Sequence, residues 1–514
     1  MEENKLEIEI KNKIKTLFTG TLINIIGEGT KRLSGYLYQI LIIKLLELKI
    51  YGIYTICYTL INIVLRFSQL GLERGGIRYI SILREENYIY NIKKLTYFLF
   101  FLSFISGIFW GTLTNIFSGV LSNLYKKQEI KEGLFYFSLT LPFYTSLLVL
   151  AYSSRGFKKM LYYVLSENIS RPILQIVFLF LLFYFFGKKI FVSILPWLFS
   201  SIISLLLILY FFKKEINTKK KEPIQKDLFK EVVIFSYPIV FISILYFLFA
   251  WTDIIVMGIF RSSEEVGIYN AVARTAEMAN VLLLAINEVF APFISTLSYK
   301  RDYESLKTLY QTIIRWTLHF SLPLFIFFFF SGKDFLLIVF GNEFIQGYIP
   351  MLILLFGLLY QNLLGESPMT LTMSGFQKEW AVTTFFGLII NILLAVTLIP
   401  KFGILGASIS TSLSLIILRT LGLFEIKKFM KFKTHNLKTF KPLAQGICTF
   451  ALIFLINLFF LEFLNNKIIN LLGNFLISYL IYFLLFLIFG IEREEKIIID
   501  SLIELLKGKY KVLK

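Results

Sequence analysis

Residues 232–260, VVIFSYPIVFISILYFLFAWTDIIVMGIF, decide the fold class. The stretch runs for 29 residues with one charged side chain, Asp253. A helix that crosses a bilayer needs about 20 mostly apolar residues, so this segment can span a membrane. Thirteen similar segments accompany it, and together they predict an all-α polytopic membrane protein with about 14 transmembrane helices. The predicted spans are residues 17–46, 51–80, 95–112, 134–152, 161–186, 191–212, 232–260, 266–297, 309–330, 348–373, 381–399, 404–424, 443–464 and 471–489.

The composition excludes several other classes of protein. Of 514 residues, 56% are hydrophobic and 17% are charged, whereas a soluble domain is about 25% charged. An ordinary soluble enzyme, a disordered chain and a secreted disulfide scaffold are therefore excluded. Cys57 and Cys448 lie in apolar runs and are interpreted as core residues, and two histidines are too few for a histidine-based metal site. We expect no metal, no cofactor and no catalytic residues.

The distribution of positive charge predicts the orientation in the membrane. The chain carries 53 Lys and Arg against 34 Asp and Glu. With the N-terminus inside, the inner segments hold 33 Lys and Arg and the outer segments hold 11. Cytoplasmic loops are enriched in these residues, so both termini should be cytoplasmic. The net charge of +19 is therefore attributed to loops and not to nucleic-acid binding.

The two halves of the chain resemble each other. Residues 49–55 (KIYGIYT) match residues 265–271 (EVGIYNA) with Gly52 on Gly267, an offset of 215. Residues 155–159 (RGFKK) match 374–378 (SGFQK) at an offset of 219. The repeat unit has six spans, an even number, so both copies insert into the membrane in the same orientation. Such parallel repeats predict two six-helix lobes related by a pseudo-two-fold axis along the membrane normal, plus two C-terminal helices. The expected organisation is an N-terminal tail 1–16, an N-lobe 17–212, a basic linker 213–231, a C-lobe 232–426, a basic loop 427–442, spans 443–490 and an amphipathic cytoplasmic tail 491–514.

Polar residues form stripes along four of the predicted spans. In the first span Asn24, Glu28 and Lys31 share one helix face, and in the fifth Glu167, Arg171 and Gln175 do so. A charge at the bilayer centre costs roughly 2.5–3.5 kcal/mol, so we expect these faces to border a common aqueous cavity. Local pairing, such as Glu28 with Arg32 or Arg274 with Glu277, is the alternative.

A cavity lined with guanidinium groups suits an anionic ligand, because guanidinium binds phosphate oxygens bidentately. The predicted ligand is a pyrophosphate carried on a lipid. The candidate substrate-binding residues are Lys31, Arg32, Arg66, Arg171 and Arg274. The candidate residues for coupling to H⁺ or Na⁺ are the embedded carboxylates Glu28, Asp253, Glu277 and Glu288.

The sequence also resembles the polysaccharide-exporting branch of the superfamily that holds multidrug extruders and peptidoglycan-precursor flippases. The resemblance is carried, in chain order, by residues 45–80, 237–258, 265–271, 292–295, 340–344 and 399–408. It implies a two-lobed flippase for undecaprenyl-pyrophosphate-linked oligosaccharides, such as O-antigen or capsule repeat units, that works by alternating access in the bacterial cytoplasmic membrane. The implied partners are membrane lipids, the lipid-linked substrate, and a glycan polymerase or glycosyltransferase.

Two other functions stay open at this point. An ion-coupled multidrug exporter would share the fold, although an acidic cavity would suit cationic drugs better. A membrane enzyme that modifies glycans would need a large outer loop or an embedded catalytic histidine, and His319 is the one candidate.

Overall fold

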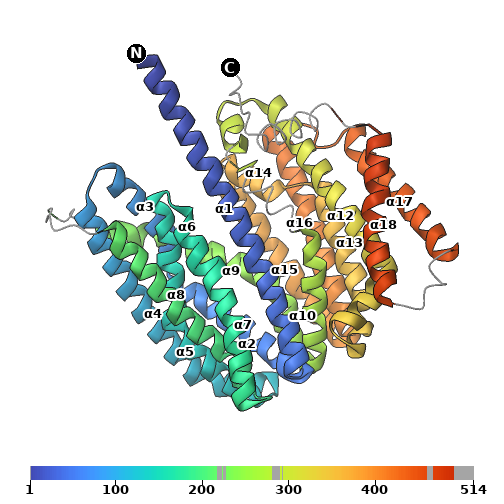
Figure 1. The fold of residues 1–514 in the computed structure, drawn as a ribbon, viewed down its shortest axis with the longest axis horizontal. Helices are drawn as coiled ribbons and strands as arrows, with labels where there is room; N and C mark the ends of the chain where they lie inside the picture. The colour runs from blue at the N-terminus through green and yellow to red at the C-terminus, as the bar shows by residue number, and fades with distance from the viewer. Residues whose placement is uncertain are drawn as a thin grey trace. The chain divides into compact units, whose positions relative to one another are not determined.

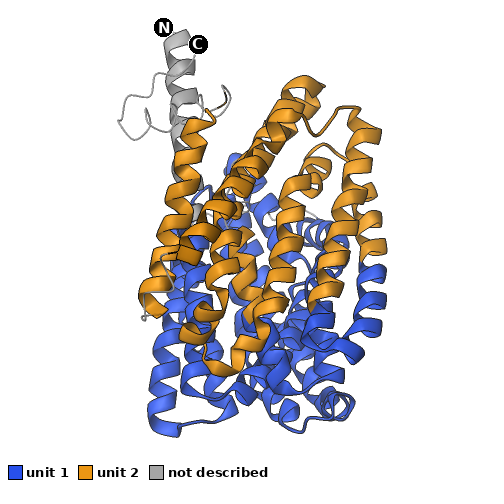
Figure 2. Cartoon of the chain, turned by 90° about the vertical axis from the view of Figure 1, so that its right-hand side faces the viewer, with its two compact units in different colours: residues 1–271, 388–407 blue, residues 272–387, 408–514 orange. Residues whose placement is uncertain are grey.

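In a computed structural model of the chain, the described residues are 2–216, 223, 227–280, 290–291, 293–459, 467–490 and 492. All regular secondary structure in this part of the chain is helical. The prediction of an all-α protein is therefore confirmed. The chain divides into two compact units, residues 1–271 with 388–407, and residues 272–387 with 408–514 (Figure 2).

Unit 1 is built on the first nine helices. They are α1 (Glu2–Leu45), α2 (Leu48–Gln69), α3 (Leu72–Glu85), α4 (Ile89–Tyr125), α5 (Glu129–Ser153), α6 (Met160–Tyr163), α7 (Arg171–Phe186), α8 (Leu195–Glu215) and α9 (Leu228–Phe260) (Figure 1). The start of α10 (Ser263–Glu277) and the end of α15 (Gln377–Phe402) also belong to it. A continuous apolar core of α3, α4, α5, α8 and α9 residues, including Leu72, Leu99 and Ile208, holds these helices together.

Unit 2 contains the later helices. They are α12 (Tyr303–Val339), α13 (Tyr348–Leu364), α14 (Ser367–Met373), α16 (Ile404–Met430), α17 (Lys441–Phe459) and α18 (Lys467–Ile488). The end of α10 and the first part of α15 complete the unit, whereas residues 404–407 at the start of α16 belong to unit 1. Within it α12 packs along α13, α17 and α18.

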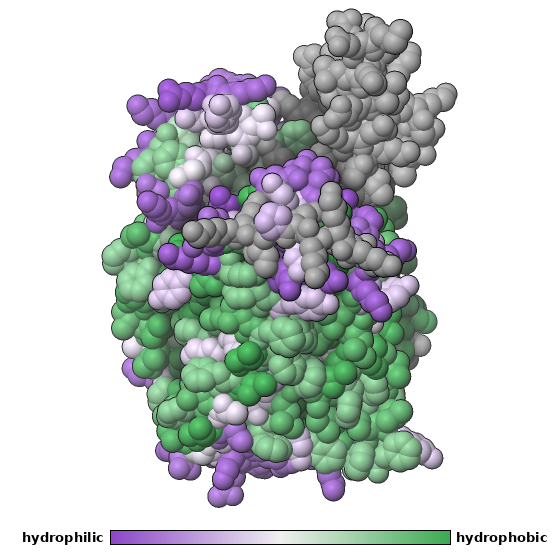
Figure 3. All heavy atoms as spheres, turned by 90° about the vertical axis from the view of Figure 1, so that its left-hand side faces the viewer, coloured by the Kyte–Doolittle hydropathy of each residue, from purple (hydrophilic) through white to green (hydrophobic). Residues whose placement is uncertain are grey.

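Twelve helices in the described ranges are long and apolar enough to cross a membrane. They correspond in order to twelve of the fourteen predicted spans. The predicted first span coincides with the C-terminal part of α1 and extends one residue beyond it, and the eighth begins in α10 and continues into residues outside the described ones. On the face drawn in Figure 3, hydrophobic residues form a broad belt between hydrophilic rims, as a bilayer requires.

Residues 217–222 and 224–226 of the linker 213–231, and the tail 491–514 except residue 492, lie outside the described residues. The division into lobes 17–212 and 232–426 stays a prediction.

Small residues allow α4 and α5 to pack closely. A Cβ atom on Gly107 would lie 2.5 Å from Pro142 Cα, and one on Gly111 would lie 2.9 Å from the Ser138 carbonyl oxygen. Ser103 Oγ reaches Ser146 Oγ across the same contact at 3.3 Å. Small side chains and hydroxyl hydrogen bonds are the usual means by which helices associate in lipid, where apolar burial alone supplies little driving force.

We predict that Gly107→Leu destabilises unit 1, because the new side chain must displace the backbone of α5. Overpacking of this kind costs about 1–3 kcal/mol or more, and it should lower the thermal unfolding midpoint in detergent. Gly119→Leu on the same helix is the control, since a Cβ atom there meets nothing within 4 Å. Equal midpoints for the two variants would contradict the proposed packing.

Candidate functional site

The N-terminal helix α1 brings a polar face against the fifth predicted span. Asn24 is buried on this face, and Glu28 and Lys31 are partly buried. Gly27 permits the close approach, since a Cβ atom there would lie 2.7 Å from Val164 Cγ1. The stripe predicted from the sequence therefore faces protein and not lipid.

The segment opposite α1 is a π-helix, Val164–Ser170, between α6 and α7. Pro172, in the first turn of α7, explains it. Proline has no N–H for the carbonyl of Asn168, four residues earlier, and its ring would clash with that carbonyl in a regular α-helix. Widening the preceding turn relieves the clash. π-Helical turns are rare and occur frequently at functional sites.

Glu167, on this π-helix, binds two cations. Its Oε1 lies 2.9 Å from Lys31 Nζ on α1, and its two carboxylate oxygens accept from Arg171 Nε at 2.8 Å and Nη2 at 2.9 Å. Glu167 is 0% exposed and Arg171 is 3% exposed. The rings of Tyr144 and Trp197 lie 4.9 Å and 4.8 Å from the guanidinium carbon. The pairing offsets the large cost of burying these charges.

A second carboxylate extends the network along α1. Glu28 Oε1 accepts from Tyr163 Oη at 3.1 Å and from Asn168 Nδ2 at 3.2 Å. Arg155 donates from Nη2 to Asn24 Oδ1 at 3.0 Å, and its guanidinium carbon lies 4.1 Å from the centroid of the Tyr163 ring. We call Glu28, Lys31, Arg155, Glu167, Asn168 and Arg171 the Glu167 cluster. It contains three cationic side chains and two carboxylates.

Several polar atoms of this region are buried without a hydrogen-bond partner in the described structure. They are Arg171 Nη1, Arg155 Nε, Asn168 Oδ1 and Gln175 Nε2. A buried polar atom without a partner costs about 1–3 kcal/mol, so these atoms mark places where water or a ligand group would be stabilised. Three of the four are donors, which favours an anionic or oxygen-rich ligand.

The structure places the predicted cations in different surroundings. Lys31 and Arg171 meet at Glu167, whereas Arg32 is exposed on α1. The Arg66 guanidinium carbon lies 5.8 Å from the centroid of the Phe247 ring, and its Nε is buried without a partner. In unit 2, Arg274 forms an ion pair with Glu277 at 2.6 Å. Local pairing, the alternative weighed from the sequence, thus holds for Arg274 and in part for Arg171.

Two further predicted carboxylates, Asp253 and Glu277, have identified partners in the structure. Asp253 is buried on α9, where its carboxylate accepts hydrogen bonds from Tyr269 Oη and from the Ile254 amide. Glu277 is the partner of Arg274. Glu288 lies outside the described residues.

The sequence prediction omitted Arg155, Tyr163, Asn168 and Glu167 from the site. Glu167 stood on the recognised stripe with Arg171, so its i, i+4 spacing already indicated the pair. Arg155 lies in a short 3-10 helix after α5, between the predicted fourth and fifth spans. Its contact with Asn24 joins residues 131 positions apart, which no local pattern shows.

The outer end of unit 1, in the predicted orientation, is held by cations that bind helix C-termini. Lys127 Nζ donates to the Gly258 and Arg261 carbonyls at the end of α9, at 2.6 Å and 2.9 Å. Arg261 in turn donates to the Ile399 and Pro400 carbonyls in the last turn of α15, both at 3.0 Å. Burial lowers the pKa of the Lys127 ammonium. Cations are favoured at helix C-termini, so these contacts stabilise the packing of α9 and the end of α15 within unit 1.

A family model described as "Polysaccharide biosynthesis protein" matches residues 17–298, which is more than half of the chain and contains the whole Glu167 cluster. The chain belongs to the polysaccharide biosynthesis protein family. Family membership and the twelve membrane-spanning helices of the described ranges identify a multi-pass membrane protein.

Two archaeal proteins resemble this chain in sequence. The probable low-salt glycan biosynthesis flippase Agl15 of Haloferax volcanii is 24% identical over 239 residues, 46% of this chain and 50% of that protein. The match thus spans half the length of that relative. An uncharacterized membrane protein of Methanocaldococcus jannaschii is 22% identical over 483 residues, 88% of this chain and 92% of that protein.

Solved structures share the fold. The lipid II flippase MurJ in its inward closed conformation superposes with a TM-score of 0.68 at 16% identity, covering 90% of this chain and 97% of that chain. An inward-facing multidrug transporter of the MATE family superposes with a TM-score of 0.61 at 15% identity, covering 80% and 94%. At these identities the likeness concerns the fold alone.

We predict that Pro172→Ala dismantles the Glu167 cluster without unfolding the protein. The restored N–H lets residues 164–170 return to an α-helix, and one residue fewer in the turn rotates Glu167 by about 100° relative to α7. Short-reagent cross-linking between Glu28→Cys and Asn168→Cys, in a Cys448→Ser background, should then fall at least fivefold. Pro323→Ala, inside α12, is the control. Unchanged cross-linking in Pro172→Ala would show that the proline does not maintain the π-helix.

Proposed function

We propose that the protein is a flippase that moves an oligosaccharide linked through pyrophosphate to undecaprenol or a similar polyprenol across the cytoplasmic membrane. Three findings support the proposal: membership in the polysaccharide biosynthesis protein family, the name of the Haloferax relative, and the buried basic cluster beside α1. The pairing of Lys31 and Arg171 on a single carboxylate is the observation that carries it.

The chemistry rests on competition for the same donors. Arg171 offers two parallel N–H groups to the Glu167 carboxylate, and this fork fits a phosphate oxygen pair equally well. A pyrophosphate that reached the cluster would take Lys31 and Arg171 from Glu167 and would also find the unpartnered Arg171 Nη1 and Arg155 Nε. The cluster can therefore exchange one anion for another without leaving its cations unpaired.

The other predicted cations complete the proposal. We assign Arg32, Arg66 and Arg274 to the path that the pyrophosphate or acidic sugars follow. The cytoplasmic location of both termini and alternating access belong to the same proposal, as does a supply of substrate by glycosyltransferases or its use by a glycan polymerase.

Ion coupling is proposed for the embedded carboxylates. When a pyrophosphate takes its cations, Glu167 is left as a buried charge, and uptake of H⁺ or Na⁺ nearby would lower that cost. Glu28 is best placed, because Asn168 connects it to the same π-helix. Asp253, Glu277 and Glu288 remain the other candidates.

Multidrug export is less well supported. The solved multidrug transporters share the fold, but the Glu167 cluster carries more cationic side chains than carboxylates. A cationic drug would be repelled by Lys31, Arg155 and Arg171. A neutral or anionic cargo fits these residues better.

The first test measures translocation in proteoliposomes with a fluorescent polyprenyl-pyrophosphate sugar and a membrane-impermeant quencher. Arg171→Met and Lys31→Met should each slow translocation at least tenfold, because the pyrophosphate loses a donor. Lys188→Met is the matched control, since Lys188 forms only an exposed ion pair with Glu47 at 3.6 Å. Translocation at the parental rate in both cluster variants would refute the proposed function.

The second test separates binding from turnover. Glu167→Gln removes the competing carboxylate, so we expect pyrophosphate-lipid binding to tighten about tenfold, equal to ~1.4 kcal/mol. Translocation should slow, because no carboxylate remains to displace the product from Lys31 and Arg171. Affinity and turnover are measured on the same reconstituted sample. Weaker binding together with slower turnover would mean that Glu167 only maintains the structure.

A further inference from the structure

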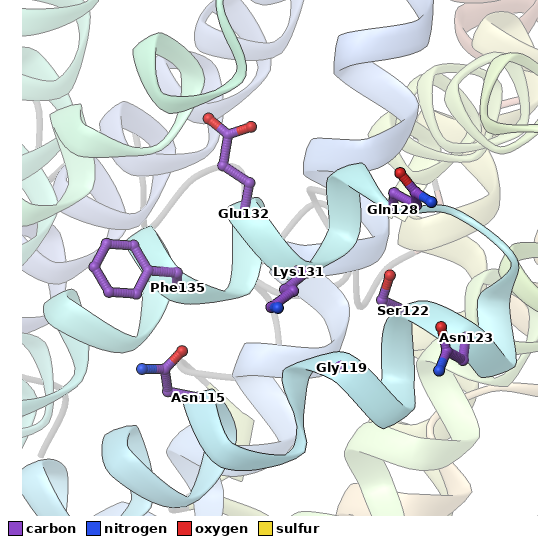
Figure 4. Close-up of a pocket in the computed structure, with 8 residues that line it drawn as sticks. All are labelled: Asn115, Gly119, Ser122, Asn123, Gln128, Lys131, Glu132 and Phe135. Atoms are coloured by element: carbon purple, nitrogen blue, oxygen red, sulfur yellow. The ribbon is translucent and has the colours of Figure 1, made fainter.

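A second site lies in unit 1, next to the turn between α4 and α5. A groove of about 660 Å³ runs between the C-terminal part of α4 and the N-terminal part of α5 (Figure 4). We call it the outer groove; it is lined by Asn115, Gly119, Ser122, Asn123, Gln128, Lys131, Glu132 and Phe135. Its volume falls within the range of about 300–1,000 Å³ that is usual for small-molecule sites.

The spacing of glycines along α4 explains why the groove exists. At Gly107 and Gly111 the two helices are in contact, whereas a Cβ atom on Gly119 would meet nothing within 4 Å. The missing side chain at Gly119 therefore leaves space open beside α4. Lys126 closes the turn in a left-handed conformation with φ of 53°, and Ser122 Oγ donates to the Lys127 carbonyl at 3.0 Å. The groove is thus a fixed feature of a well-braced hairpin.

Apart from Ser122, the polar side chains of the groove have no hydrogen-bond or ion-pair partner among the described residues. Among the hydrogen bonds and ion pairs of the described residues, none involves the side-chain polar groups of Asn115, Asn123, Gln128, Lys131 or Glu132. Each of these side chains is exposed. In Figure 4 Asn115 and Lys131 extend into the space between the two helices, whereas Glu132 extends away from α4. They are available to a ligand.

The residue types select a class of ligand. A carboxamide presents two N–H donors and one acceptor oxygen, which matches pairs of hydroxyl groups that each donate and accept. Phe135 adds an apolar aromatic face, against which the C–H face of a sugar ring can pack. The one cation, Lys131, and the one carboxylate, Glu132, leave the groove without net charge. These features favour a neutral polyhydroxylated ligand over an anionic lipid headgroup.

A second hollow of about 570 Å³ shares the lining residue Gln128 with the outer groove. Its lysines are largely engaged, since Lys49 pairs with Glu129 at 2.7 Å and Lys127 binds the end of α9. The hollow therefore extends the polar surface of the groove and adds little free positive charge. Together the two spaces suit an extended ligand of several sugar rings.

We propose that the outer groove binds neutral sugar residues of a glycan on the outer side of the membrane. The proposal rests on the proposed function only for the source of that glycan and for the orientation of the α4–α5 turn. The groove shares no residue with the Glu167 cluster, so the two sites can be tested separately.

The experiment measures saturation-transfer NMR from the full-length protein in nanodiscs to three probes: maltotriose, a trimer of galacturonic acid, and glycerol phosphate. We expect transfer to maltotriose, weaker transfer to the acidic trimer and none to glycerol phosphate. Gly119→Trp, which fills the open space, should abolish the maltotriose signal. Asn123→Ala and Phe135→Ala should each weaken it at least threefold. Gly473→Trp is the matched control, because a Cβ atom at that α18 glycine also meets nothing within 4 Å.

The outcomes separate this proposal from the proposed function. Glu167→Gln should keep maltotriose binding, and Gly119→Trp should keep single-turnover translocation of the lipid-linked sugar. A maltotriose signal that survives Gly119→Trp, or binding of glycerol phosphate alone, would overturn the sugar site. Loss of binding in Gly119→Trp and Gly473→Trp alike would also overturn it, because the effect would not be specific to the groove.

Discussion

The buried ion pairs of Glu167 constrain the rest of the candidate site. A carboxylate without solvent exposure needs compensation, and here Lys31 from α1 and Arg171 from α7 provide it. The requirement ties two helices that are far apart in sequence, and it orients the polar face of α1 inward. Tyr163 and Asn168 then extend the same contact to Glu28. A site organised by charge compensation is also one that a charged ligand can reorganise.

Hydropathy was sufficient to predict the membrane class and nearly all spans, because lipid imposes a length and a composition on every crossing helix. The stripes on α1 and on the fifth span also placed Lys31, Glu167 and Arg171 on inward faces. The π-helix could not be predicted in this way. Pro172 indicated a bend, but whether a helix kinks or widens at a proline also depends on what packs against it, and here α1 packs closely on this segment at Gly27.

The partners of individual charges were harder to predict than the charges themselves. Arg155 belongs to the cluster because the turn after α5 folds back onto α1, and this follows from tertiary packing. Arg274 is a predicted substrate-binding residue, yet it forms an ion pair with Glu277, one helical turn away. A periodic pattern identifies the face of a helix, whereas the choice between a local and a distant partner depends on the neighbouring helices.

The π-helix of residues 164–170 has a mechanical consequence. A π-turn holds one residue more than an α-turn, so the fifth span carries a surplus residue in its interior. If the surplus moves by a turn along the span, the segment it passes rotates about the helix axis, while the backbone exchanges hydrogen bonds without losing them. The ends of the span can then stay anchored as the side chains between them turn toward a different neighbour.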